Sequence, residues 1–142
     1  MHIPFLDVKQ TYLELEAEID TALKGVLRGG QYILGENVER FETEFAAYCG
    51  CQYGIGVASG LDALQLILKA HGIGPGDDVI VPANTYIATL LAVSGTGANP
   101  VLVEPDPTTC NIDPARIEAA LTANTKAIMA VHLYGQAADM RH

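Results

Sequence analysis

Short apolar runs alternate with helical patterns from residue 53 to residue 132, and this alternation restricts the fold more than any other feature. The runs are almost wholly apolar, as in Ile128-Met129-Ala130-Val131. Such strands, separated by single helices, are typical of a mostly parallel sheet with helices on both faces. We expect strands at 53–58, 79–81, 100–103 and 126–132, and helices at 61–71, 85–93 and 114–121.

Two further helices are expected before this segment. Apolar residues recur every three or four positions over 12–26 and again over 38–45, which is the spacing of one helix face. The loop between them, 29–35, carries three apolar or aromatic side chains. Because that is unusual for a passive linker, we expect this loop to be exposed or to line a site.

The charge balance excludes some partners. There are 17 acidic and 8 basic residues, a net charge of −9, and the basic residues form no cluster. A nucleic-acid or anionic-membrane surface is therefore not expected. No stretch approaches the roughly 20 apolar residues of a membrane span. The first residues lack the basic segment of a signal peptide, so we expect a cytoplasmic protein.

The three cysteines do not predict a metal site. Cys49-Gly50-Cys51 lacks the second cysteine pair, or the histidines, that a zinc site needs, and Cys110 stands alone. We therefore expect no metal and interpret the three thiols as buried or half-buried side chains.

The stretch "VASGLDALQL" places a serine and a glycine where an apolar run meets a helical pattern. Ser59 and Asp62 have the spacing of a capping box, which on its own means only the start of a helix. Gly60, however, leaves room for a ligand, and the amides of such a helix would face the carboxyl edge of the sheet. That arrangement favours a phosphate site without a lysine. Neither of the usual glycine-rich phosphate loops is present.

Two later strands end in residues that can serve either the core or a site. Tyr86 follows the strand at 79–81 and is either a half-buried core side chain or a flat partner for a planar heterocycle. His132 and Tyr134 follow the strand at 126–132. A single histidine in such a place is structural or catalytic, and both readings stay open.

Six segments in register resemble the N-terminal part of the DegT/DnrJ/EryC1/StrS family of pyridoxal-phosphate-dependent sugar aminotransferases. They are "FLDVKQTY", "GGQYILGENVERFETEFAAYCG", "GVASGLDALQLIL", "GIGPGDDVIVPANTYIAT", "GANPVLVEPDPTTCNIDP" and "AIMAVHLYGQAADM". The resemblance implies an α/β protein of transferase fold type I, with residues 1–142 as an incomplete large, cofactor-binding domain. Residues 1–50 would form N-terminal helices and a site-lining loop, and residues 51–142 the alternating strand and helix segment.

The resemblance also implies site residues. Gly60, Leu61 and Asp62 match the family's turn that holds the phosphate of pyridoxal 5'-phosphate, and Tyr86 matches the aromatic residue that stacks on its ring. By the same resemblance, Gln31, Tyr32 and Ile33 are expected to line the substrate entrance. Leu61 stands where many relatives carry threonine, and it resembles the branch that acts on dTDP-linked 3-keto deoxysugars.

The implied reaction moves an amino group from an amino acid, usually glutamate, to a keto-sugar nucleotide in a homodimer. In relatives, the catalytic lysine and the carboxylate that protonates the pyridine nitrogen lie beyond residue 142. We therefore assign no catalytic residue and expect no transaminase activity from these 142 residues alone. Two alternatives remain open, a non-catalytic module that binds phosphate or nucleotide and a truncated, inactive gene product.

Overall fold

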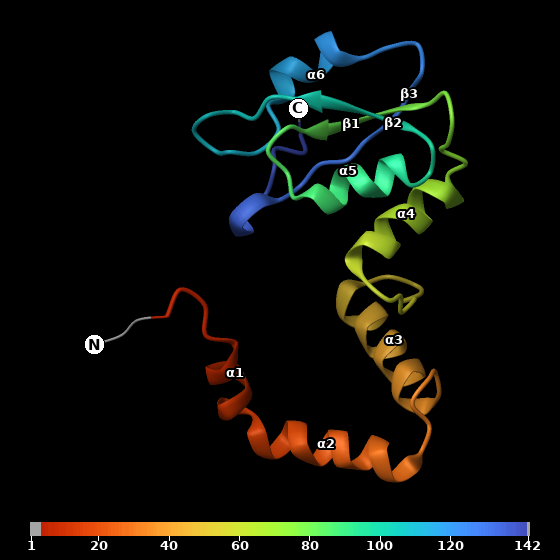
Figure 1. Ribbon diagram of the computed structural model, residues 1–142, viewed down its shortest axis with the longest axis vertical. Coiled ribbons are helices and arrows are strands. Elements are labelled where there is room, and N and C mark those ends of the chain that lie inside the picture. The colour runs from red at the N-terminus through yellow and green to blue at the C-terminus, as the bar shows by residue number, and fades with distance from the viewer. Residues whose placement is uncertain (1–3, 142) are drawn as a thin grey trace. The chain divides into compact units, whose positions relative to one another are not determined.

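The computed structural model describes residues 4–141 and divides the chain into two units, one ending at Gly56 and one beginning at Val57 (Figure 1). Among the helices within residues 4–141, none has the length and apolarity needed to cross a membrane.

The first unit contains three helices, α1 (Val8–Glu14), α2 (Glu16–Gly29) and α3 (Glu36–Cys49). The single helix expected over 12–26 is wrong, because the backbone of Leu15 (φ −119°, ψ 13°) leaves the helical region. Across this break, the Tyr12 hydroxyl donates to the Asp20 carboxylate at 3.0 Å. The hydrogen bond to Asp20 is the main reason that the pKa of Tyr12 rises to about 12.

The strand expected at 53–58 is also absent. This segment follows α3 as irregular backbone, and no strand within residues 4–141 pairs with it. One of its amides is held instead by a side chain, since Gly56 N–H donates to Glu42 Oε1 at 2.6 Å. Ile55 is 81% exposed. Residues 53–58 thus have the composition of a β-strand, but no neighbouring strand within residues 4–141 forms hydrogen bonds with them.

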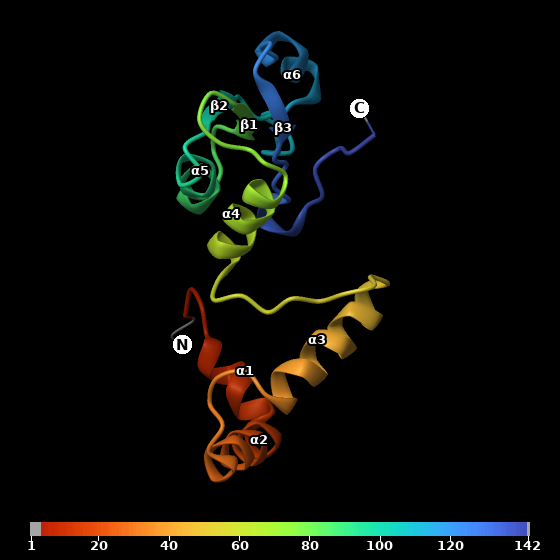
Figure 2. The same ribbon diagram turned by 90° about the vertical axis from the view of Figure 1, so that its right-hand side faces the viewer.

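The second unit is built on a three-stranded parallel sheet. Its strands are β1 (Asp78–Pro82), β2 (Asn99–Val103) and β3 (Thr125–Ile128), arranged in the order β2-β1-β3 (Figure 2). The central strand β1 is buried over its last four residues. The expected parallel sheet is therefore confirmed, with the strand ends shifted by a few residues.

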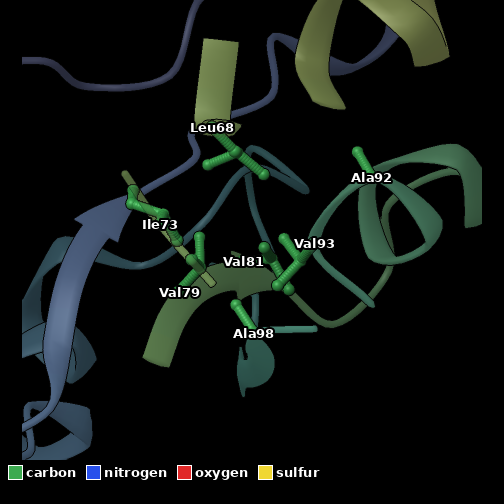
Figure 3. Close-up of a cluster of buried hydrophobic side chains, with 7 residues drawn as sticks. All are labelled: Leu68, Ile73, Val79, Val81, Ala92, Val93 and Ala98. Atoms are coloured by element: carbon green, nitrogen blue, oxygen red, sulfur yellow. The ribbon is translucent and has the colours of Figure 1, made fainter. Parts of the chain in front are cut away.

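Helices cover both faces of this sheet, as expected. On one face, α4 (Gly60–Ala70) and α5 (Ile87–Ser94) pack against Val79 and Val81 of β1 (Figure 3). On the other face, Ile80 contacts a second cluster, against which α6 (Pro114–Ala120) packs. The buried members of the two clusters besides β1 are Leu68, Ile73, Ala92, Val93 and Ala98 on the first face and Val103, Ile112 and Ala138 on the second.

One carboxylate joins the amino ends of the strands. Asp78, the first residue of β1, accepts from Thr122 Oγ1 at 2.5 Å and from Asn99 Nδ2 at 2.9 Å. Asn99 is the first residue of β2, and Thr122 comes three residues before β3. These hydrogen bonds, above all the one from Thr122, hold the pKa of Asp78 below its usual value.

We expect Asp78→Asn to lower the urea midpoint at neutral pH, and the difference from the parent to shrink in acid. A carboxyl whose folded pKa is depressed stabilises the fold above its unfolded pKa of about 3.9 and loses that contribution as the pH falls through the folded value. The measurement is urea unfolding, followed by circular dichroism, in steps from neutral pH down to about pH 3. Parallel losses in parent and variant would show that Asp78 contributes no such stabilisation.

Candidate functional site

Helix α4 begins as the sequence predicts. Ser59 is its N-cap residue, with extended backbone, and Ser59 Oγ accepts from the Asp62 amide at 3.2 Å. The return contact of the expected capping box differs, because the Asp62 carboxylate accepts from Ser59 Oγ at 2.9 Å rather than from the Ser59 amide. Aspartate is one methylene shorter than the glutamate of the usual box, so it reaches the nearer donor.

This cap leaves two donors free at the start of the helix. Within the described residues, no protein group accepts from the amides of Gly60 and Leu61. A Cβ placed on Gly60 would meet nothing within 4 Å, so the space in front of these amides is open. Free amides at the positive end of a helix are suited to an anion such as a phosphate.

Tyr86 lies beside this helix start. It is the N-cap residue of α5 rather than a residue of its first turn, and it follows the carboxyl end of β1 after a short turn. Its side chain is 75% exposed, which contradicts the reading of Tyr86 as a half-buried core residue. The ring is therefore free to contact a ligand.

A single hollow of about 840 Å³ joins the two features. Ser59, Gly60 and Leu61 line it at the start of α4, and Tyr86 lines it just before α5. The remaining lining is almost wholly apolar and contains no lysine or arginine: Ala63, Leu64, Ile87, Ala88, Thr89 and Leu91. Three of the four residues predicted to bind the cofactor are thus together; the fourth, Asp62, does not line the hollow and gives its amide to Ser59.

The predicted substrate-lining residues lie in the first unit. Gln31, Tyr32 and Ile33 are all exposed, as the sequence predicts for this loop. Tyr32 donates its hydroxyl to the Leu27 carbonyl at 3.2 Å, which ties the loop to the end of α2. Their position at a substrate entrance stays a prediction.

Sequence reasoning missed a buried asparagine below the loop that follows β3. Asn111 is 2% exposed; its Nδ2 donates to the Gln136 carbonyl at 3.1 Å, and its Oδ1 accepts from the Leu133 amide at 3.1 Å. His132 Nδ1 accepts from the Ala138 amide at 3.0 Å, which supports the structural reading of this histidine. Asn111 thus holds the loop after β3 in place. Its burial in the structure reveals this role, and the motif "TTCNIDP" contains no pattern that predicts it.

A free helix start and an exposed aromatic ring at the carboxyl edge of a parallel sheet are features that suit an α/β protein to a phosphate-bearing ligand. The sequence profile of the DegT/DnrJ/EryC1/StrS aminotransferase family matches residues 13–142. The chain belongs to this family.

Relatives of known name agree with this assignment. The dTDP-3-amino-3,6-dideoxy-alpha-D-galactopyranose transaminase of Aneurinibacillus thermoaerophilus is 60% identical over 138 residues, which are 97% of this chain and 38% of the relative. The structure of DesV from S. venezuelae matches with a TM-score of 0.94 at 56% identity, over 97% of this chain and 37% of DesV. NtdA from Bacillus subtilis, solved with bound cofactor PMP, matches with a TM-score of 0.89 at 43% identity, over 97% of this chain and 32% of NtdA.

The chain thus spans less than two fifths of the length of each of these three proteins. The structural relatives confirm the expected fold class, the N-terminal part of the large domain of a type I pyridoxal-phosphate-dependent transferase.

Proposed function

We propose that these 142 residues are the cofactor-binding front part of a pyridoxal-phosphate-dependent aminotransferase. The observation that carries the proposal is the hollow of about 840 Å³, in which the start of α4 and the ring of Tyr86 meet. The residues fit the cofactor: the amides of Gly60 and Leu61 would hold its phosphate, and Tyr86 would stack on its pyridine ring. When bound, the cofactor supplies the electron sink that amino-group transfer needs.

The roles of the chain's own residues follow from their contacts. Ser59 fixes the first turn of α4 through the Asp62 amide, so the neighbouring amides point outward in one orientation. Asp62 keeps Ser59 in place because its carboxylate accepts a hydrogen bond from the Ser59 hydroxyl. We therefore assign Asp62 a positioning role in the cofactor site. The remaining walls of the hollow are almost wholly apolar, and they would suit the ring of the cofactor.

For the substrate, we propose a dTDP-linked 3-keto-6-deoxyhexose, with glutamate as the amino donor. Two observations support this choice, Leu61 in the phosphate turn and the name of the Aneurinibacillus relative, a dTDP-3-amino-3,6-dideoxy-sugar transaminase. We further propose a homodimer in the cytoplasm, in which Gln31, Tyr32 and Ile33 line the substrate entrance. The exposure of these three side chains supports that role.

The test uses the protein encoded by the full reading frame that contains these residues. Incubated with pyridoxal phosphate, glutamate and the dTDP-linked 3-keto-6-deoxyhexose, it is expected to form an amino sugar and an equal amount of 2-oxoglutarate. Mass spectrometry measures the first product and an enzymatic assay the second. Transfer to UDP- or GDP-linked keto sugars but not to the dTDP sugar would contradict the substrate, and no transfer to any of them would contradict the reaction.

A further inference from the structure

Two thiols at the end of α3 take no part in the proposed reaction. Cys49 is the last residue of the helix, and Cys51 follows it after a single glycine. Both are free and exposed, which contradicts the expectation of buried thiols. Cys110, in the second unit, is also free and exposed, but it is the only cysteine of residues 57–142.

The backbone between the two thiols is turned back on itself. Gly50 is in the left-handed region (φ 68°, ψ 24°), and the Cys51 amide donates to the Ala46 carbonyl at 2.9 Å. The Cys51 sulfur lies 3.8 Å from the carbonyl oxygen of Cys49. The turn therefore holds the Cys51 side chain close to the backbone of Cys49, and both residues are exposed.

The spacing suits a disulfide. Two peptide units separate the Cα atoms, so even a fully extended chain would hold them no more than about 7 Å apart. The turn at Gly50 shortens that distance into the range of about 4.4–6.8 Å that disulfides span.

A reagent can also reach the pair. Cys51 lines an open hollow of about 410 Å³ together with Glu42, Thr43 and Tyr53. In thiol–disulfide exchange the protein thiolate attacks the disulfide, so the reagent must reach the sulfur, and both cysteines are exposed.

We propose that Cys49 and Cys51 form a modification site at which a low-molecular-weight disulfide, such as glutathione disulfide, reversibly oxidises the pair to an intrachain disulfide. The Cys51 thiolate attacks one sulfur of glutathione disulfide, forms a mixed disulfide and releases one glutathione thiolate. The Cys49 thiolate then attacks the Cys51 sulfur and releases the second glutathione. The protein loses two protons and two electrons, and the two glutathione molecules carry them.

The resulting ring is small and is closed across a helix end. Such a disulfide is strained and has a more oxidising potential than an ordinary structural one, so cellular thiols reduce it again. The pair therefore acts as a reversible site rather than as a permanent staple.

The experiment measures which form each cysteine takes in a glutathione redox buffer at about 0.1 mM total glutathione. After quenching and digestion with trypsin, peptide 41–69 carries both Cys49 and Cys51, and peptide 70–116 carries Cys110. We expect 41–69 to lose two hydrogen atoms and carry no glutathione, while 70–116 carries glutathione. The internal thiol has an effective concentration on the order of 1 mM or more, about tenfold above the glutathione present.

Cys51→Ser is the matched variant, because it leaves Cys49 without an internal partner. It should carry at least about tenfold more glutathione on peptide 41–69 than the parent chain does. Equal glutathione on this peptide in parent and variant would overturn the proposal, as would a cross-link between peptides 41–69 and 70–116. The parent chain alone decides the matter if the variant fails to fold, since its own peptide 41–69 either forms the internal disulfide or does not.

Discussion

Ile80→Ala is expected to lower the free energy of unfolding of the second unit by about 2–5 kcal/mol. Ile80 is in the central strand β1 and is 0% exposed. Its side chain belongs to the cluster that α6 covers, where Val103 and Ile112 are its buried neighbours. Because the surrounding strands cannot collapse into the space left by three missing carbons, the cost includes a cavity as well as lost burial. Urea unfolding followed by circular dichroism measures it.

The matched control is Ile67→Ala in α4 of the same unit. Ile67 is 56% exposed, so the same change in chemistry should cost less than about 1 kcal/mol. If Ile80→Ala is no more damaging than Ile67→Ala, the second face of the sheet is not a packed core, and the two-faced arrangement described above is wrong.

Gly60→Leu is expected to weaken the binding of pyridoxamine phosphate by about tenfold to a hundredfold while the fold stays intact. A Cβ on residue 60 meets nothing within 4 Å, so the new side chain starts in open space, and leucine is a better helix former than glycine. It would nevertheless fill the place in front of the free amides. A charge-assisted hydrogen bond contributes about 1.5–3 kcal/mol, which sets the expected loss.

Isothermal calorimetry with pyridoxamine phosphate is the suitable measurement, because this amine cannot form an imine with surface lysines. The parent should bind pyridoxamine, which lacks the phosphate, more weakly than it binds pyridoxamine phosphate. The affinity for pyridoxamine should be about the same in the parent and in the variant. Gly25→Leu in α2 provides the control, since Gly25 also faces open space within a helix. Unchanged affinity in Gly60→Leu would place the anion elsewhere.

Tyr86→Ala removes the ring but leaves the amides in place. It should weaken the binding of pyridoxamine phosphate about fivefold, or by ~1 kcal/mol, in the same calorimetric measurement.

The sequence predicts most of the second unit because its signals there are local. The apolar runs of β1, β2 and β3 and the Ser59 cap of α4 each appear in a few consecutive residues, and all are found. The position of Tyr86 at the sheet edge follows from the same reasoning, since a residue just after a parallel strand must lie at its carboxyl end.

What the sequence misses depends on partners and on single dihedral angles. Residues 53–58 are rich in strand-forming side chains, yet a strand exists only where another strand pairs with it. The helix breaks at Leu15, where the sequence has no glycine or proline. The helical spacing of apolar residues continues across the break, so the sequence does not predict it. The exposed thiols are missed because cysteine is most often buried, and only the structure shows that the turn at Gly50 leaves Cys49 and Cys51 on the surface.

The anion-binding groups at the start of α4 belong to the main chain, and this has a practical result. Truncating side chains one at a time to alanine would leave every one of those donors in place, so a conventional scan would report the region as tolerant. Replacing the peptide bond before Gly60 or Leu61 by an ester removes a donor N–H without changing any side chain. Chemical protein synthesis is therefore the method that can weigh each donor by itself.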